Sequence, residues 1–185
     1  MLVVSMEKAL QISKLEAAKR QLETAIRLYF INCDPVSIHT LAAAAYSVIR
    51  DVNKKRGGKP MLIKELAFDY LNPKGEKIWM KKMNEAENFF KHADRDHGKT
   101  LDFRPELTEI FILDACFHYY DLTKEFPPLF TIYRAWFTAI HPDMFKFPDE
   151  QARLIGSQAP EIASMGRKAY FDIALPQFMK HTIKK

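Results

Sequence analysis

Prolines and glycines divide this sequence into long runs with a helical period, and their placement limits the fold more than any other feature. Pro35, Pro105 and Pro128 each stand at the start of a run in which apolar residues recur every three or four positions. Proline is favoured there because the first N–H groups of a helix have no partner within the helix. Gly57 ends the run that Pro35 begins, as glycine commonly does at a helix C-terminus. No segment alternates apolar and polar residues convincingly, so the sequence predicts an all-α protein.

The helical runs are joined by short loops, which favours antiparallel packing of neighbouring helices. With 185 residues, 48% of them hydrophobic, the chain is long enough to bury one core. We therefore predict a single all-helical domain over residues 1–185, an antiparallel bundle with its core in residues 6–124 and a helical extension in residues 125–185. The expected helices span residues 6 or 13–31, 35–56, 61–70, 75–92, 105–126, 127–140, 149–156 and 161–180.

Charge and cysteine content bear on the partners and the compartment. The formal net charge of +5 is compatible with a nucleic-acid partner. Cys33 and Cys116 are the only cysteines and do not form a CxxC pair, so no disulfide framework is expected. The N-terminal MLVVSMEK lacks the basic region and cleavage site of a signal peptide, and no apolar segment is long enough to span a bilayer. We therefore expect a cytoplasmic protein with no membrane partner.

The stretch of residues 84–103, NEAENFFKHADRDHGKTLDF, concentrates polar and titratable side chains at the expected end of a helix. Asn88 and His92 are four residues apart, so they share one face of this helix. A solvated helix end, where the helix dipole mildly favours a histidine, is the simpler interpretation. We predict that both side chains point away from the core, because they lie about 200° around the helix from an apolar stripe of Trp79, Met83, Ala86 and Phe90.

Two long helices, a short helix and a helix that ends in NFFKH, residues 88–92, resemble the HEPN (higher eukaryotes and prokaryotes nucleotide-binding) superfamily. The resemblance covers residues 6–124 at most. It implies a homodimer, and in members that cut RNA without a metal an arginine, usually followed by asparagine, acts with a histidine at the dimer interface. Glu87 stands where that arginine is expected, and a carboxylate would repel phosphate. The resemblance therefore implies binding of RNA, a nucleotide or a protein partner without efficient RNA cleavage.

Candidate functional residues follow from this motif and from histidines on neighbouring helices. The resemblance makes Asn88, Lys91 and His92 the candidate catalytic residues, with the Lys91 side chain leaving the helix about 100° from His92. The predicted binding surface adds to these three His39, Asp94, Arg95 and His118. If the helices that carry them adjoin, His39, His92 and His118 line one pocket. The alternative is that each forms a separate structural hydrogen bond.

A metal site is the second hypothesis for the same region. The loop after the helix offers His92 and Asp94, and a later apolar run offers Asp114 and His118 one helical turn apart. Together they would supply the nitrogen and oxygen ligands of a metal-dependent hydrolase. No HExxH or EF-hand pattern occurs, and aspartate and histidine on one buried helix face also hydrogen-bond with each other. No cofactor is predicted. A purely structural bundle that binds a partner is the third interpretation, so the sequence leaves open whether the chain is an enzyme.

Overall fold

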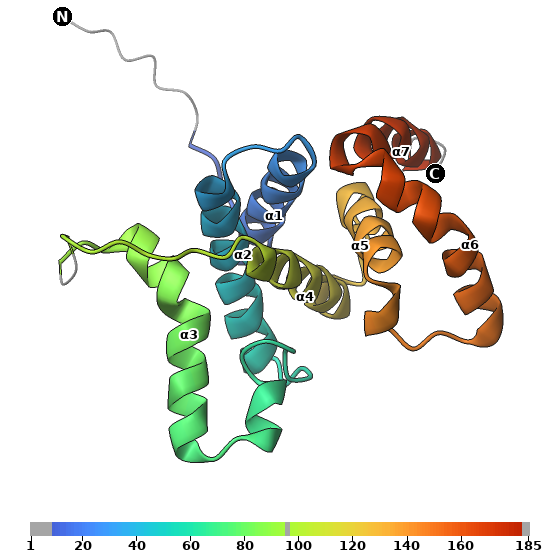
Figure 1. Cartoon of the computed structure of the whole chain (residues 1–185). Coiled ribbons are helices and arrows are strands. Elements are labelled where there is room, and N and C mark those ends of the chain that lie inside the picture. The colour runs from blue at the N-terminus through green and yellow to red at the C-terminus, as the bar shows by residue number, and fades with distance from the viewer. Residues whose placement is uncertain (1–8, 95–96, 183–185) are drawn as a thin grey trace, which may run out of the picture.

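The computed structural model describes residues 9–94 and 97–182, and over these residues the chain is all-α, as the sequence predicts (Figure 1). None of the helices in the described part is both long and apolar enough to cross a membrane. In chain order, the elements are α1 (Lys14–Phe30), α2 (Pro35–Lys55), the 3-10 helix η1 (Leu66–Tyr70), α3 (Pro73–Lys91), α4 (Glu106–Thr123), α5 (Pro128–Ile140), the 3-10 helix η2 (Pro142–Met144), α6 (Asp149–Met165) and α7 (Arg167–Thr182).

The first two helices form a hairpin whose ends follow the capping residues in the sequence. The Ser13 side chain accepts a hydrogen bond from the backbone N–H of Glu16 at 3.1 Å, which fixes the start of α1. The Asp34 carboxylate accepts from the backbone N–H of Ser37 at 2.8 Å, and Pro35 is the first residue of α2. The predicted starts of both helices are therefore confirmed, the first of them at the later of its two alternatives.

Helix α4 lies in the middle of the molecule and packs against α1, α2 and α5. Half of its residues are buried, and they lie on nearly every face of the helix, as a central position requires. The alanines of α2 allow close approach of neighbouring helices, and Ala42, Ala43 and Ala45 are fully buried. The core is thus built around α4, with the α1–α2 hairpin on one side and α5 on the other.

The C-terminal helices join this core through aromatic side chains. The Phe30 ring at the end of α1 stacks on Phe171 of α7 with 4.8 Å between ring centroids. Trp136 of α5 donates a hydrogen bond to the hydroxyl of Tyr29 at 3.2 Å. The predicted end of a helix near residue 156 is wrong, because α6 continues through Pro160 to Met165. Gly166, with a φ of 75°, follows as its C-cap, a conformation that glycine adopts without a Cβ clash.

Helix α3 stands at the edge of the molecule and packs chiefly against α2 among the helices (Figure 1). None of its residues is buried, so the expected buried stripe is only half-buried along its length at Trp79, Met83, Ala86 and Phe90. The segment before α3 also differs from expectation, because residues 62–65 form turns and only Leu66–Tyr70 are helical, as a 3-10 helix. Side chains from other helices hold this segment in place.

Candidate functional site

The predicted polar edge is exposed at the C-terminal end of α3. The side chains of Asn88, Lys91 and His92 all face solvent, so the outward direction inferred from helical spacing is confirmed for Asn88 and His92. His92 caps the helix in extended conformation, and its backbone N–H donates to the carbonyl oxygen of Asn88 at 3.0 Å. Asp94 is exposed beyond the cap, whereas Arg95 lies outside the described residues.

Glu87, at the position where the resemblance expects an arginine, is held by two lysines. One carboxylate oxygen lies 2.8 Å from the ammonium nitrogen of Lys91, and the other lies 3.4 Å from that of Lys64. Burial alone would raise the pKa of Glu87, but its contacts with Lys91 and Lys64 outweigh burial and lower it. The carboxylate is therefore charged and paired, and the expected repulsion of phosphate is largely offset by its two partners.

Lys64 is an unusual residue because its side chain is only 3% exposed. Its ammonium group lies over the rings of Tyr46 and Phe111, 5.4 Å and 5.3 Å from the ring centroids. Its backbone N–H donates to the Tyr46 hydroxyl at 3.3 Å. Burial lowers the pKa of Lys64, while the charge of Glu87 acts in the opposite direction. Lys64 and Glu87 thus form a partly buried ion pair between the segment before η1 and α3.

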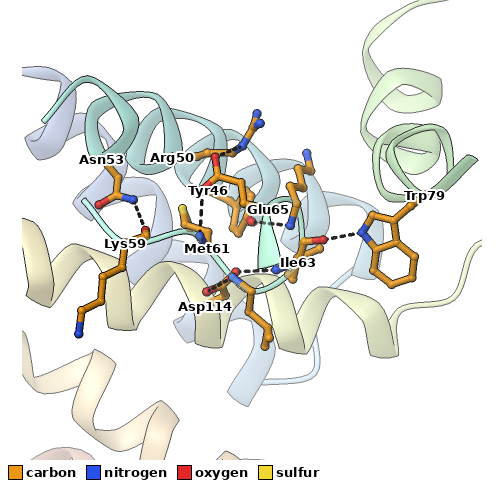
Figure 2. Close-up of polar contacts among 11 residues, drawn as sticks. Tyr46, Arg50, Asn53, Lys59, Met61, Ile63, Glu65, Trp79 and Asp114 are labelled. Atoms are coloured by element: carbon orange, nitrogen blue, oxygen red, sulfur yellow. Dashed lines mark hydrogen bonds and ion pairs between the residues drawn. The ribbon is translucent and has the colours of Figure 1, made fainter. Parts of the chain in front are cut away.

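The residues around Lys64 are fixed by side chains of α2 (Figure 2). Asn53 donates to the carbonyl oxygen of Lys59 at 2.7 Å. Arg50 forms an ion pair of 3.0 Å with Glu65, whose second carboxylate oxygen accepts from the backbone N–H of Met61 at 2.9 Å. A segment without regular structure therefore has its backbone groups satisfied by side chains rather than by a helix.

Helices α3 and α4 hold the same segment from the other side (Figure 2). The Trp79 indole N–H donates to the carbonyl oxygen of Ile63. The Asp114 carboxylate accepts from the backbone N–H groups of Leu62 and Ile63 at 3.3 Å and 3.1 Å. His118 Nδ1 lies 3.1 Å from the same carboxylate and 3.0 Å from the Asp114 carbonyl oxygen. Asp114 and His118 are therefore engaged within the fold.

These contacts decide the metal hypothesis for the described residues. Asp114 directs its oxygens to backbone N–H groups, whereas His92 and Asp94 are exposed at the far end of α3. In the part of the chain that the structure describes, no group of three or more His, Cys, Asp or Glu residues is arranged to hold a metal ion. The structure does not bring together the proposed ligands His92, Asp94, Asp114 and His118. The prediction of a metal-dependent hydrolase with this set of ligands is therefore wrong.

His39 occupies a different environment from the other candidate histidines. It is only 2% exposed, and its Nδ1 lies 2.9 Å from the Thr108 hydroxyl on α4. Thr108 is ten residues before His118 on the same helix, a rise of about 15 Å. His92 is exposed beyond the end of α3. The hypothesis that the three histidines line one pocket is therefore wrong, and the separate hydrogen bonds of His39 and His118 match the alternative.

Sequence reasoning missed two residues that shape this region. Lys64 stands in the apolar stretch MLIKELAF, and a lone lysine there is the signal that could have indicated a buried cation. Thr108, in the first turn of α4, is 3% exposed and pairs with His39. Neither partnership follows from sequence spacing, because each joins residues far apart in the chain.

Comparison with known proteins adds no relative to this description. No family model, curated protein or solved structure matches the chain. The features of the chain that bear on its function are therefore the all-α fold, the exposed polar edge at residues 88–94 and the charges that surround it.

Proposed function

We propose that the chain is a cytoplasmic, HEPN-like helical protein that pairs with a second copy of itself and binds RNA through the surface around residues 88–97, without efficient RNA cleavage. The observation that carries this proposal is the pairing of Glu87 with both Lys64 and Lys91. The two lysines neutralise the negative charge of Glu87, so the polar edge beside it can accept an anion.

The charge balance supports a polyanionic ligand. Two lysines and one glutamate leave the Glu87 cluster with a net positive charge, and the Lys91 side chain remains 35% exposed. The whole of α3 carries five lysines and three glutamates. Lysines that neutralise phosphates release counterions from a nucleic acid, which gives affinity that depends on salt.

Exposed polar and aromatic groups beside the lysines favour RNA over a protein partner. Asn88 and His92 offer an amide and an imidazole to base edges or phosphates. Phe89 is only half-buried and packs edge-on against Phe90 with 6.1 Å between ring centroids. A partly exposed ring next to positive charge is the combination on which unpaired bases stack in single-stranded RNA.

The same pairing argues against efficient cleavage. Phosphodiester cleavage needs a cation placed where charge develops on the phosphate. Position 87 supplies a carboxylate, Lys64 is buried, and Lys91 is bound to Glu87 at 2.8 Å. Lys91 can still attract a phosphate with its exposed part, but the cluster has no cation without a carboxylate partner, which cleavage would require. These contacts therefore support binding rather than cleavage.

Pairing with a second copy is supported by the incomplete burial of α3. A helix of a monomeric protein usually buries its apolar face, but α3 has no buried residue. Its large apolar side chains are half-buried at Trp79, Met80 and Met83 and exposed at Ile78. A second α3 packed against this helix would remove that surface from water and bring two polar edges together.

Binding of a fluorescent single-stranded RNA, followed by anisotropy at several salt concentrations, tests the proposal. Lys91→Ala is expected to weaken binding about tenfold and to lower the salt slope by about 1, because one phosphate contact is lost. His92→Ala is expected to weaken binding with little change of the slope, since a neutral imidazole releases no counterion. The matched control is Lys168→Ala, which removes an exposed lysine paired with Asp172 four residues away on α7. Unchanged RNA affinity of both folded variants would contradict the proposal.

A further inference from the structure

An apolar hollow of about 350 Å³ lies between η1 with the residues before it, α3 and the first turns of α4. Its walls include Leu62, Leu66, Trp79, Met83 and Leu107. Every wall atom that is accessible from this space is apolar. The volume is in the range of small-molecule sites. The apolar hollow is therefore large enough for the apolar part of a ligand, but it offers that ligand no hydrogen bond.

Much of the exposed apolar surface of the described residues is gathered around this hollow. Of the thirteen large apolar side chains that are exposed there, five line it, namely Leu62, Leu66, Tyr70, Leu107 and Met144. Tyr70 is the most exposed of them, at 90%. Single exposed apolar side chains are common on protein surfaces, but a group of them around one hollow marks a binding site.

A second, polar hollow of about 290 Å³ adjoins the first, because Met83, Leu107 and Phe111 line both. Leu107 is exposed, so the shared edge is open to solvent. The walls of the polar hollow expose polar as well as apolar atoms, and their charged residues are Lys82, Glu85, Asp102 and Arg104. The two hollows together therefore have an apolar end beside Trp79 and a polar end, as a site for an amphiphile requires.

The charges at the polar end favour an uncharged head group. The ammonium nitrogen of Lys82 lies 3.3 Å from a carboxylate oxygen of Glu85, so these two charges are paired. Asp102 and Arg104 are both exposed and carry opposite charges. A charged head would be attracted by one of them and repelled by the other. A hydroxyl or an amide can donate to the carboxylate and accept from the guanidinium, so it meets no repulsion.

We propose that the two hollows bind an amphiphile with a linear aliphatic chain and an uncharged polar head such as a hydroxyl or an amide. The chain lies in the apolar hollow beside Trp79, because a polar head there would lose its hydrogen bonds with water and gain none. The head lies at the polar hollow beside Asp102 and Arg104. A linear chain suits the site because it can follow the open edge at Met83 and Leu107 from one hollow to the other.

This site goes beyond the proposed binding of RNA and does not share its residues. None of Asn88, Lys91 and His92 lines either hollow. On α3, Ile78 projects about 100° away from Trp79. A second copy that packs on Ile78 therefore does not need the face of α3 that lines the apolar hollow.

Quenching of tryptophan fluorescence by bromine, which requires close approach to the indole ring, tests the site in the full chain. Trp79 lines the apolar hollow, whereas Trp136, the other tryptophan, is only 4% exposed in the core. The probe is 12-bromododecan-1-ol, with bromine at the end of the chain, and its isomer 2-bromododecan-1-ol carries bromine beside the head. We expect the first isomer to quench Trp79 at least threefold more strongly at saturation. Equal quenching by both isomers, or none by either, would overturn the proposal.

The charge of the head is tested with two analogues of the same chain length. We expect 12-bromododecanoate and 12-bromododecylamine, which are anionic and cationic at neutral pH, to bind at least threefold more weakly than 12-bromododecan-1-ol. Tighter binding of either charged analogue would overturn the assignment of an uncharged head.

Two variants test the apolar hollow itself. Ala67→Leu fills it from η1 and is expected to weaken binding of 12-bromododecan-1-ol at least tenfold. Leu66→Asp places a charge at an exposed part of its wall and should have the same effect even if Ala67→Leu does not fold. Ile173→Asp, at an exposed apolar position of α7, is the matched control and should bind as wild type does. Full affinity of either folded variant of the hollow would refute the proposal.

Discussion

Asp114→Ala is the substitution with the largest expected effect on the segment that carries Lys64. The carboxylate accepts hydrogen bonds from the backbone N–H groups of Leu62 and Ile63 (Figure 2). It also contacts Nδ1 of His118. Asp114 is 3% exposed, so water does not replace it easily when it is removed. Alanine therefore leaves these donors unpaired inside the protein.

The magnitude follows from the individual bonds. A buried donor that loses its partner costs about 1–3 kcal/mol, and more when that partner is charged. The N–H of Ile63 is buried and bears the full cost, whereas the Leu62 side chain is 50% exposed and its N–H, bound at 3.3 Å, is solvated more readily. With the contact to His118 also lost, we expect a total of about 3–4 kcal/mol. That is a large part of the ~5–15 kcal/mol that stabilises an ordinary domain.

Urea unfolding measured by circular dichroism and by tryptophan fluorescence provides the assay. Trp79 reports on this segment directly, because its indole N–H is bonded to Ile63. Asp121→Ala removes an exposed carboxylate further along α4, 4.0 Å from the ammonium nitrogen of Lys124, and should cost less than about 0.5 kcal/mol. Equal stabilities of the two variants, or a loss under about 1 kcal/mol for Asp114→Ala, would refute the assigned role.

The pH dependence of the same variant provides a second check. Burial by itself lowers the pKa of His118, but its bonds with the Asp114 carboxylate and carbonyl outweigh burial and raise it. A raised pKa in the folded state contributes stability that is complete below the unfolded value of 6.5 and is lost as the pH rises through the folded value. The difference in stability between wild type and Asp114→Ala should therefore shrink above neutral pH.

Two further predictions concern His39 and the association of chains. His39 has a pKa of about 4 when folded and 6.5 when unfolded, so the unfolded chain takes up the proton first and stability falls as the pH drops from about 6.5 toward 4. This difference in pKa corresponds to about 3 kcal/mol of stability. In urea unfolding, His39→Gln should lose less stability than wild type as the pH falls over this range. An identical loss of stability in both proteins would contradict the prediction. Light scattering at micromolar concentrations should give about twice the chain mass of 21.5 kDa, and Ile78→Asp, at an exposed apolar position of α3, should shift it toward one chain. A single-chain mass for wild type would count against pairing through α3.

The local signals in the sequence predict the helices well because they act through neighbouring residues. Ser13 and Asp34 cap the helices that follow them, and Pro35 is the first residue of α2. Helical spacing likewise places Asn88 and His92 on an exposed face. Each of these inferences needs only the geometry of one helix.

The interactions that the sequence does not predict are those between distant segments. The residues before η1 do not form an α-helix, because Asp114, Tyr46 and Trp79 satisfy their backbone groups from three different helices. The partnership of Lys64 with Glu87 joins residues 23 positions apart. Such pairs depend on the order in which helices pack, and spacing along one helix carries no information about that order.

Glu87 links the packing of α3 to the buried Lys64. Helix α3 has few helical neighbours, and the Glu87–Lys64 ion pair and the Trp79–Ile63 hydrogen bond are its polar links to the segment before η1. An arginine at position 87 would place a second cation beside the buried ammonium group of Lys64, and both would lack a counter-charge. Positions 64 and 87 are therefore coupled: an arginine at position 87 requires a residue other than lysine at position 64. Lys64 and Glu87 together therefore fix α3 against the segment before η1 and leave its C-terminal end exposed.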